Sequence, residues 1–216
     1  PQLIEVQDFR LKTPQSDIRN STTLRYDNFN ELVQLTEDVA LEPTFDNSQL
    51  AFDDLAYFTP SITEIKQLNT DLQQTIELKG QVAGTFANFQ DIMLDLSVSD
   101  AVRLQASGSL QNVLRPEEMR YTLSLDELST SYDDLQQLTQ NIGLPTGLDS
   151  LGRFTLAGNF RGNLDSLIGK RVRLNTASYT ALRGDLKLDN LTNPNDLRFY
   201  LDVEELRSQA SDLAGF

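Results

Sequence analysis

The chain has 216 residues, with 18 lysines and arginines against 32 aspartates and glutamates, and a net charge of −14 at pH 7. It contains no cysteine, histidine or tryptophan, which excludes disulfides, thiol and imidazole chemistry and the usual zinc sites. The negative charge argues against nucleic acid as a partner and disfavours anionic lipid surfaces, and no run of about 18 apolar residues or signal-like leader is present.

The first part of the chain predicts strands, because apolar and polar residues alternate along it with a period of two. The alternation skips between Val6 and Phe9, which predicts a change of register inside the first strand. These strands are expected over 3–12, 22–26 and 39–45.

The stretch from Ile76 to Leu135 is the unit that the chain repeats. Three of its residues return 78 positions later: Gly80 as Gly158, Gly84 as Gly162 and Leu128 as Leu206. The middle glycine differs, since Gly108 returns as Gly184 after 76 positions, which we interpret as a two-residue change in a turn. In a more worn first copy, Leu50–Leu55 stands where Leu123–Leu128 stands later. We therefore expect one continuous array with units over 1–70, 71–148 and 149–216, the last cut short within a longer parent protein.

Each unit has one apolar and one polar strand face. In the closing strand of the second unit, Tyr121 and Leu123 point one way while Arg120 and Thr122 point the other. Four glycines fall on the apolar face and are expected to mark points at which the sheet curls: Gly80, Gly84, Gly158 and Gly162. Their spacing also fits the GxxxG motif of membrane helices, but the polar flanks argue against that alternative.

Helical signals are short and lie between the strands. Each is bounded by a breaker or a cap: Pro60 ends the first, Ser61 begins the second and Gly143 ends the third. The expected helices cover 53–58, 61–72 and 131–143. A loop is expected after the third, where Pro145, Gly147 and Gly152 follow.

Acidic pairs recur along the chain, at Asp53-Asp54, Asp126-Glu127, Asp133-Asp134 and Glu204-Glu205. Carboxylate pairs can serve in acid–base chemistry or bind calcium. Their recurrence beside strand ends and helix starts favours helix-start and solubility charges instead. The one basic cluster, Lys170–Arg173, is interpreted as a solvated strand rather than a binding patch, and Asn20-Ser21-Thr22 fits a glycosylation acceptor. No nucleophile, phosphate loop or metal cluster appears, so we expect neither an enzyme nor a cofactor.

The continuous apolar face has two interpretations. It could be the dry core of a sandwich or solenoid. Alternatively, because the sheet is long and little helical sequence is present to cover it, the face could stay open as a trough. An exposed apolar surface of that extent is typical of a binding site.

The order of three segments resembles the repeat region of TamB-like proteins of the AsmA superfamily, in the forms seen in Bacteroidota. These segments are Leu50–Pro60, Leu78–Phe89 and Leu104–Leu110, and the second returns at Leu156–Gly162. The resemblance implies a mainly antiparallel β-sheet curled into an apolar trough. It also implies a periplasmic protein that is anchored in the inner membrane, carries phospholipid towards the outer membrane and has an outer-membrane barrel of the TamA type as its partner. No catalytic residue is carried over.

From the resemblance and the apolar face together we expect a middle segment of a lipid bridge, whose trough shields phospholipid acyl chains. The alternatives are a structural scaffold of an outer-membrane assembly machine, which binds no lipid, and a repeat adhesin with a dry core. The residues expected to line the trough are Ile76, Leu78, Val82, Phe86, Leu94, Leu96, Leu104, Leu110, Tyr121, Leu123, Leu125, Phe154, Leu156, Phe160, Leu174, Leu186, Leu188, Phe199, Leu201 and Val203.

Overall fold

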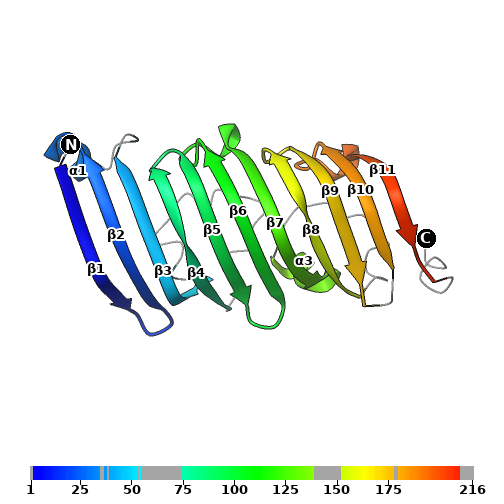
Figure 1. The fold of residues 1–216 in the computed structure, drawn as a ribbon, viewed down its shortest axis with the longest axis horizontal. Helices are drawn as coiled ribbons and strands as arrows, with labels where there is room; N and C mark the ends of the chain where they lie inside the picture. Colours follow the sequence, from blue (N-terminus) through cyan, green and yellow to red (C-terminus); the bar gives the residue numbers. More distant parts are fainter. Residues whose placement is uncertain are drawn as a thin grey trace.

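In the computed structural model the chain forms one antiparallel sheet of eleven strands, in which each strand pairs with its neighbours in sequence (Figure 1). The structure describes residues 2–34, 37, 39–52, 54, 74–138, 152–177 and 180–209. The expected all-β, antiparallel fold with a few short helices is confirmed.

The strands are β1 (Gln2–Lys12), β2 (Asp17–Tyr26), β3 (Ala40–Ala51), β4 (Thr75–Thr85), β5 (Phe89–Val98), β6 (Val102–Gln111), β7 (Arg120–Ser131), β8 (Arg153–Gly162), β9 (Ser166–Thr176), β10 (Ala181–Asp189) and β11 (Arg198–Arg207). The helical segments are α1 (Phe29–Gln34), the 3-10 turn η2 (Pro116–Glu118), α3 (Tyr132–Leu138) and the 3-10 turn η4 (Pro194–Asp196).

Three strands do occupy the first part of the chain, and the register of β1 against β2 shifts between Val6 and Phe9 as predicted. Of the expected third helix, the structure shows α3, whose N-cap Ser131 accepts a hydrogen bond from the backbone N–H of Asp134 at 3.2 Å. The rest of that helix lies outside the described residues, as do nearly all of the two expected helices over 53–58 and 61–72.

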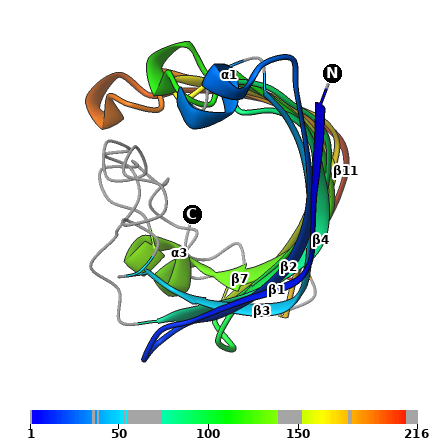
Figure 2. The same ribbon diagram turned by 90° about the vertical axis from the view of Figure 1, so that its left-hand side faces the viewer.

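The strands β4–β7 and β8–β11 follow the same order of elements. In each group three strands are followed by a proline-led 3-10 turn and then a fourth strand, with η2 and η4 at matching places. The strands β1–β3 have α1 where the later groups have these turns. The end-on view places α1 and the turns along the same rim of the sheet (Figure 2).

The register corrects two details of the repeat. Leu104 and Leu182 hold matching positions, since each pairs with a leucine on both sides. Gly184 therefore takes the place of Ala106, and the two-residue change in a turn that we inferred from the glycines is wrong. Leu50 pairs with Ile76 at the end of β3, and Ser48 instead holds the place that Leu128 holds in β7. The sequence Leu50–Leu55 is thus not the counterpart of Leu123–Leu128.

The sheet is open, with β1 and β11 as its edges, and it bends only gradually along its strands (Figure 2). We expected the sheet to curl at the glycines, but it is neither closed nor strongly curled. The glycines instead allow neighbouring backbones to approach closely. A Cβ on Gly80 would lie 2.1 Å from the carbonyl oxygen of Met93, and one on Gly162 would lie 2.0 Å from that of Ser166.

The main buried cluster lies at one end of the strands. Phe52 packs there against Ile76, Val98 and Val102, and Leu138 of α3 covers part of the same cluster. Because Ile76 and Val98 belong to the apolar face of the sheet, α3 lies on that face, and Figure 2 shows it on the inner side of the bend. The apolar face is therefore the inner one.

Candidate functional site

Strand pairing aligns eight leucines into one row, which we call the leucine row. It crosses β4 to β11 without interruption, because each leucine is the direct partner of the next one across the sheet. Neighbouring strands lie about 4.8 Å apart, so the row is about 34 Å long. Its members are Leu78, Leu96, Leu104, Leu128, Leu156, Leu174, Leu182 and Leu206. The first four leucines recur 78 positions later as the last four, so the two repeats contribute equivalent residues to the row.

Two further rows run beside it on the same face. The middle row consists of Val82, Ile92, Gly108, Leu123, Phe160, Gly169, Leu186 and Leu201. The outer row crosses all eleven strands, through Ile4, Leu24, Leu41, Gly84, Phe89, Leu110, Tyr121, Gly162, Leu167, Leu188 and Phe199. No charged residue stands in any of the three rows, which makes a continuous apolar surface.

The leucine and outer rows are not sealed inside a core. None of their side chains falls among the buried residues; most are half-buried, and Leu206 and Phe199 at the β11 edge are each 52% exposed. By contrast, Ile92 and Phe160 of the middle row are buried. Exposed apolar area that continues over many strands is typical of a binding surface.

The predicted lining residues fall into groups. The leucine row takes Leu78, Leu96, Leu104, Leu156 and Leu174; the middle row takes Val82, Leu123, Phe160, Leu186 and Leu201; and the outer row takes Leu110, Tyr121, Leu188 and Phe199. Leu94, Leu125 and Val203 lie between the leucine and middle rows. Ile76 and Phe154 are buried at the strand ends, and Phe86 lies in the turn after β4.

Sequence reasoning missed three members of the leucine row, Leu128, Leu182 and Leu206. The repeat offset could have found them. Leu104 was already a candidate and Leu182 stands 78 positions after it, while Leu128 and Leu206 were recognised as a repeated pair.

Tyr121 brings the one polar group into the outer row. Its partner across the ladder is Gly162, and a Cβ built there would lie 2.9 Å from the tyrosine hydroxyl. The ring thus fills the space that the missing side chain leaves, as aromatic residues do opposite sheet glycines. Burial raises the pKa of the Tyr121 phenol to about 12, since the phenolate would lose its hydration in these surroundings.

We expect Tyr121 to ionise about two pH units later than a solvated tyrosine, whose pKa is about 10. Because the pKa is raised in the folded state, the neutral phenol favours folding fully below pH 10, and this contribution is lost as the pH rises through 12. The ultraviolet absorbance of the native protein minus that of Tyr121→Phe isolates this titration. A midpoint near 10 would show that the outer row is open to water at Tyr121.

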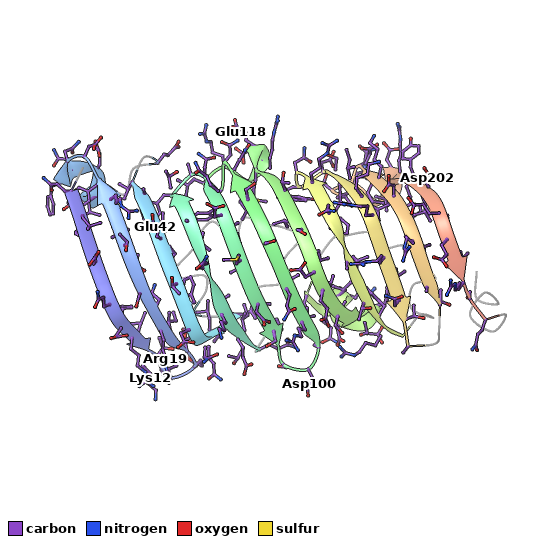
Figure 3. All side chains as sticks on the ribbon, in the orientation of Figure 1. Lys12, Arg19, Glu42, Asp100, Glu118 and Asp202 are labelled. Carbon is purple, nitrogen blue, oxygen red and sulfur yellow. The ribbon has the colours of Figure 1, made fainter. Side chains whose placement is uncertain are left out.

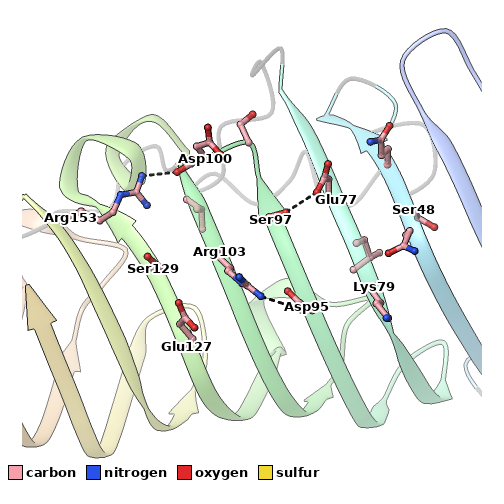
Figure 4. A pocket seen from close by; sticks show the side chains of 15 residues that line it. Ser48, Glu77, Lys79, Asp95, Ser97, Asp100, Arg103, Glu127, Ser129 and Arg153 are labelled. Atoms are coloured by element: carbon pink, nitrogen blue, oxygen red, sulfur yellow. Dashed lines mark hydrogen bonds and ion pairs between the residues drawn. The ribbon is translucent and has the colours of Figure 1, made fainter. Parts of the chain in front are cut away.

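The opposite face is polar and carries charges of both signs, among them Arg19, Glu42 and Asp202 (Figure 3). One hollow on this face has a volume of about 760 Å³. There the charges satisfy one another: Arg103 lies 3.8 Å from Asp95, and Arg153 donates to the backbone carbonyl of Asp100 at 2.6 Å (Figure 4).

Two of the acidic pairs lie inside strands rather than at helix starts. Asp126-Glu127 and Glu204-Glu205 coincide with register shifts in β7 and β11, where one strand carries an extra residue. Asp133-Asp134 does lie in the first turn of α3, as expected. For the fourth pair, Asp53 lies outside the described residues, and Asp54 accepts hydrogen bonds from Thr13 and Ser16, which lower its pKa.

In comparisons with known proteins, no family model, curated protein or solved structure matches this chain. Among the described helices, none has the length and apolar character needed to cross a membrane. In the same residues, no group of three or more histidine, cysteine or acidic side chains is arranged to hold a metal ion.

Proposed function

We propose that this chain is a segment of a bridge-like lipid-transport protein, and that its apolar face forms a shallow trough that shields phospholipid acyl chains. The observation that carries the proposal is the uncharged, half-exposed leucine row, which continues across eight strands. The gradual bend of the sheet places this row on its inner side (Figure 2).

The mechanism requires no bond chemistry. Each acyl methylene removed from water contributes about 0.8 kcal/mol, so a chain lying along the rows is retained on the sheet. Similar side chains recur at every strand, about 4.8 Å apart. Neighbouring positions along the row are therefore nearly equal in free energy, and a chain can move from one to the next without entering water. Half of a bilayer's hydrocarbon core, about 15 Å, fits within the row's length.

The headgroup of such a lipid would remain in solvent at the open rim. The resemblance to TamB-like proteins supports a periplasmic location, a parent protein anchored in the inner membrane that reaches the outer membrane, and a TamA-type barrel as partner, contacted through other regions of the parent. The apolar rows favour acyl chains, and the resemblance supports phospholipid as the lipid that carries them.

One observation favours a limited version of the dry-core alternative. Phe52, Ile76, Val98 and Val102 are buried together beneath α3, so this end of the strands is packed protein. The proposed trough therefore lies along the leucine, middle and outer rows, away from this packed end. A lipid-free scaffold is the alternative that the following experiment tests.

A photo-crosslinking residue placed at Leu123 or Leu201 is expected to capture phospholipid in cells. Placed at Thr122 or Asp202, it is expected to capture none, because adjacent residues of a strand point to opposite faces. The measurement is mass spectrometry of the adducts. The two pairs are matched controls, since each compares neighbours in the same strand. Folded protein without a lipid adduct at either leucine would leave the scaffold alternative in place.

A further inference from the structure

Strand pairing on the polar face brings two arginines directly opposite each other. Arg173 of β9 is the partner of Arg183 of β10. Like charges in this arrangement destabilise a sheet. Among the described residues, neither guanidinium has a carboxylate within ion-pair distance; the neighbouring ion pairs are Lys170 with Asp185 at 2.5 Å and Arg207 with Glu205 at 2.6 Å.

A third arginine lies beside this pair in an unusual backbone conformation. Arg171 occupies the bulge of β9 with φ of 52°, in the left-handed region. The other described non-glycine residues with positive φ are aspartate, asparagine or serine, whose short polar side chains suit turns and bulges better. With the Asn159 amide turned to accept, its oxygen receives hydrogen bonds from Arg171 Nη2 at 2.7 Å and Nε at 3.2 Å. The guanidinium is thus held in place at a cost in backbone strain.

The three arginines line one hollow of about 650 Å³. Asp126 and Glu204 also line it, but in the part of the chain that the structure describes neither forms an ion pair with an arginine. In the larger hollow of the polar face, by contrast, Arg103 lies near Asp95 and Arg153 donates to a backbone carbonyl. The arginine hollow thus combines opposed like charges, backbone strain and arginines that form no ion pair among the described residues. Glu205, the partner of Arg183 on β11, is ion-paired with Arg207.

We propose that Arg171, Arg173 and Arg183 form a binding site for a phosphate group. Guanidinium groups donate paired N–H bonds that match phosphate oxygens, and a bound dianion would remove the repulsion between Arg173 and Arg183. The site faces away from the apolar rows, so an acyl chain on the inner face cannot share a headgroup with it. This inference is therefore independent of the proposed lipid trough.

The test is calorimetric titration of the whole chain with inorganic phosphate at low ionic strength. Arg173→Gln and Arg183→Gln are each expected to weaken binding by about tenfold or more, as loss of a charge-assisted hydrogen bond does. Lys187→Gln is the matched control. Lys187 lies on the same face of β10 but pairs with Asp189 at 2.5 Å, so its loss should leave phosphate affinity unchanged.

The variant Arg171→Asn distinguishes loss of the binding site from loss of the fold. Asparagine tolerates the left-handed conformation better than arginine, so this variant is expected to melt no lower than the native protein while binding phosphate more weakly. A destabilised but still binding Arg171→Asn variant would overturn the proposal. So would phosphate binding that is absent, or that is unchanged in Arg173→Gln and Arg183→Gln.

A second titration, with soluble dihexanoyl phosphatidic acid, distinguishes the source of the phosphate group. Equal affinity for this lipid and for inorganic phosphate, lost equally in the arginine variants, would assign the site to free phosphate groups. Tighter binding of the lipid that is still lost in the arginine variants would assign it to a lipid headgroup. Binding of the lipid alone that persists in these variants would count against the site.

Discussion

Leu201→Arg is expected to yield a folded protein that no longer captures lipid, whereas Val98→Arg is expected not to fold. Val98 is 3% exposed within the cluster beneath α3, where an arginine would be buried and unpaired. Leu201 is 37% exposed at the β11 edge, where the arginine head can reach water while its charge interrupts the middle row.

Circular dichroism reports the fold of these variants, and mass spectrometry of the purified proteins reports bound lipid. Asp202→Arg is the matched control, because it introduces the same side chain at the next residue but on the polar face. This control should retain both fold and lipid. If Leu201→Arg kept its lipid, the middle row would not carry acyl chains, and if it failed to fold, the dry-core alternative would gain support.

Gly80→Ala is expected to lower the free energy of unfolding by about 3 kcal/mol. Gly80 has φ of 152°, which L side chains rarely adopt, and its Cβ would meet the Met93 carbonyl oxygen at 2.1 Å. Because that oxygen belongs to the backbone of β5, the clash can be relieved only by moving β4 and β5 apart.

Gly152→Ala supplies the comparison. Gly152 also has positive φ, at 61°, but nothing lies within 4 Å of a Cβ built on it. Its loss should therefore report backbone strain alone, about 1 kcal/mol. Urea denaturation of both variants measures the difference. Equal losses of unfolding free energy in the two variants would show that the close approach of β4 and β5 adds no cost when a Cβ is placed at Gly80.

The strands and their faces were predictable because a period of two determines which side chains share a face, whatever the tertiary structure. The shift between Val6 and Phe9 was visible for the same reason: two apolar residues on one face stood three positions apart. Most of the residues on the apolar face could be identified from this period.

Pairing across the sheet was harder to predict, since it depends on register. The glycines suggest one alignment of the repeats, but Gly184 occupies the place of Ala106. The two residues at this place share a small size, not glycine itself. The bulges at Asp126 and Glu204 lie within strands, and nothing in the sequence distinguishes these two residues from the other polar residues of the strands. Arg183 stands ten positions from Arg173 in sequence, and only the register of β9 against β10 makes them partners. The basic cluster identified along the chain, Lys170–Arg173, therefore does not include Arg183, the third arginine of the hollow.

Each of the two later repeats contains four strands. Because four is an even number, further copies of the repeat could be added to the sheet. Successive antiparallel strands reverse direction, so an even set returns the chain to its starting direction with the same side chains facing inward. A whole copy can then be gained or lost by translation alone, whereas an odd set would move the 3-10 turn to the opposite rim. Each added copy lengthens the sheet by four strand spacings, about 19 Å. The length of a protein built in this way can change in steps of that size while the contacts between neighbouring strands stay the same.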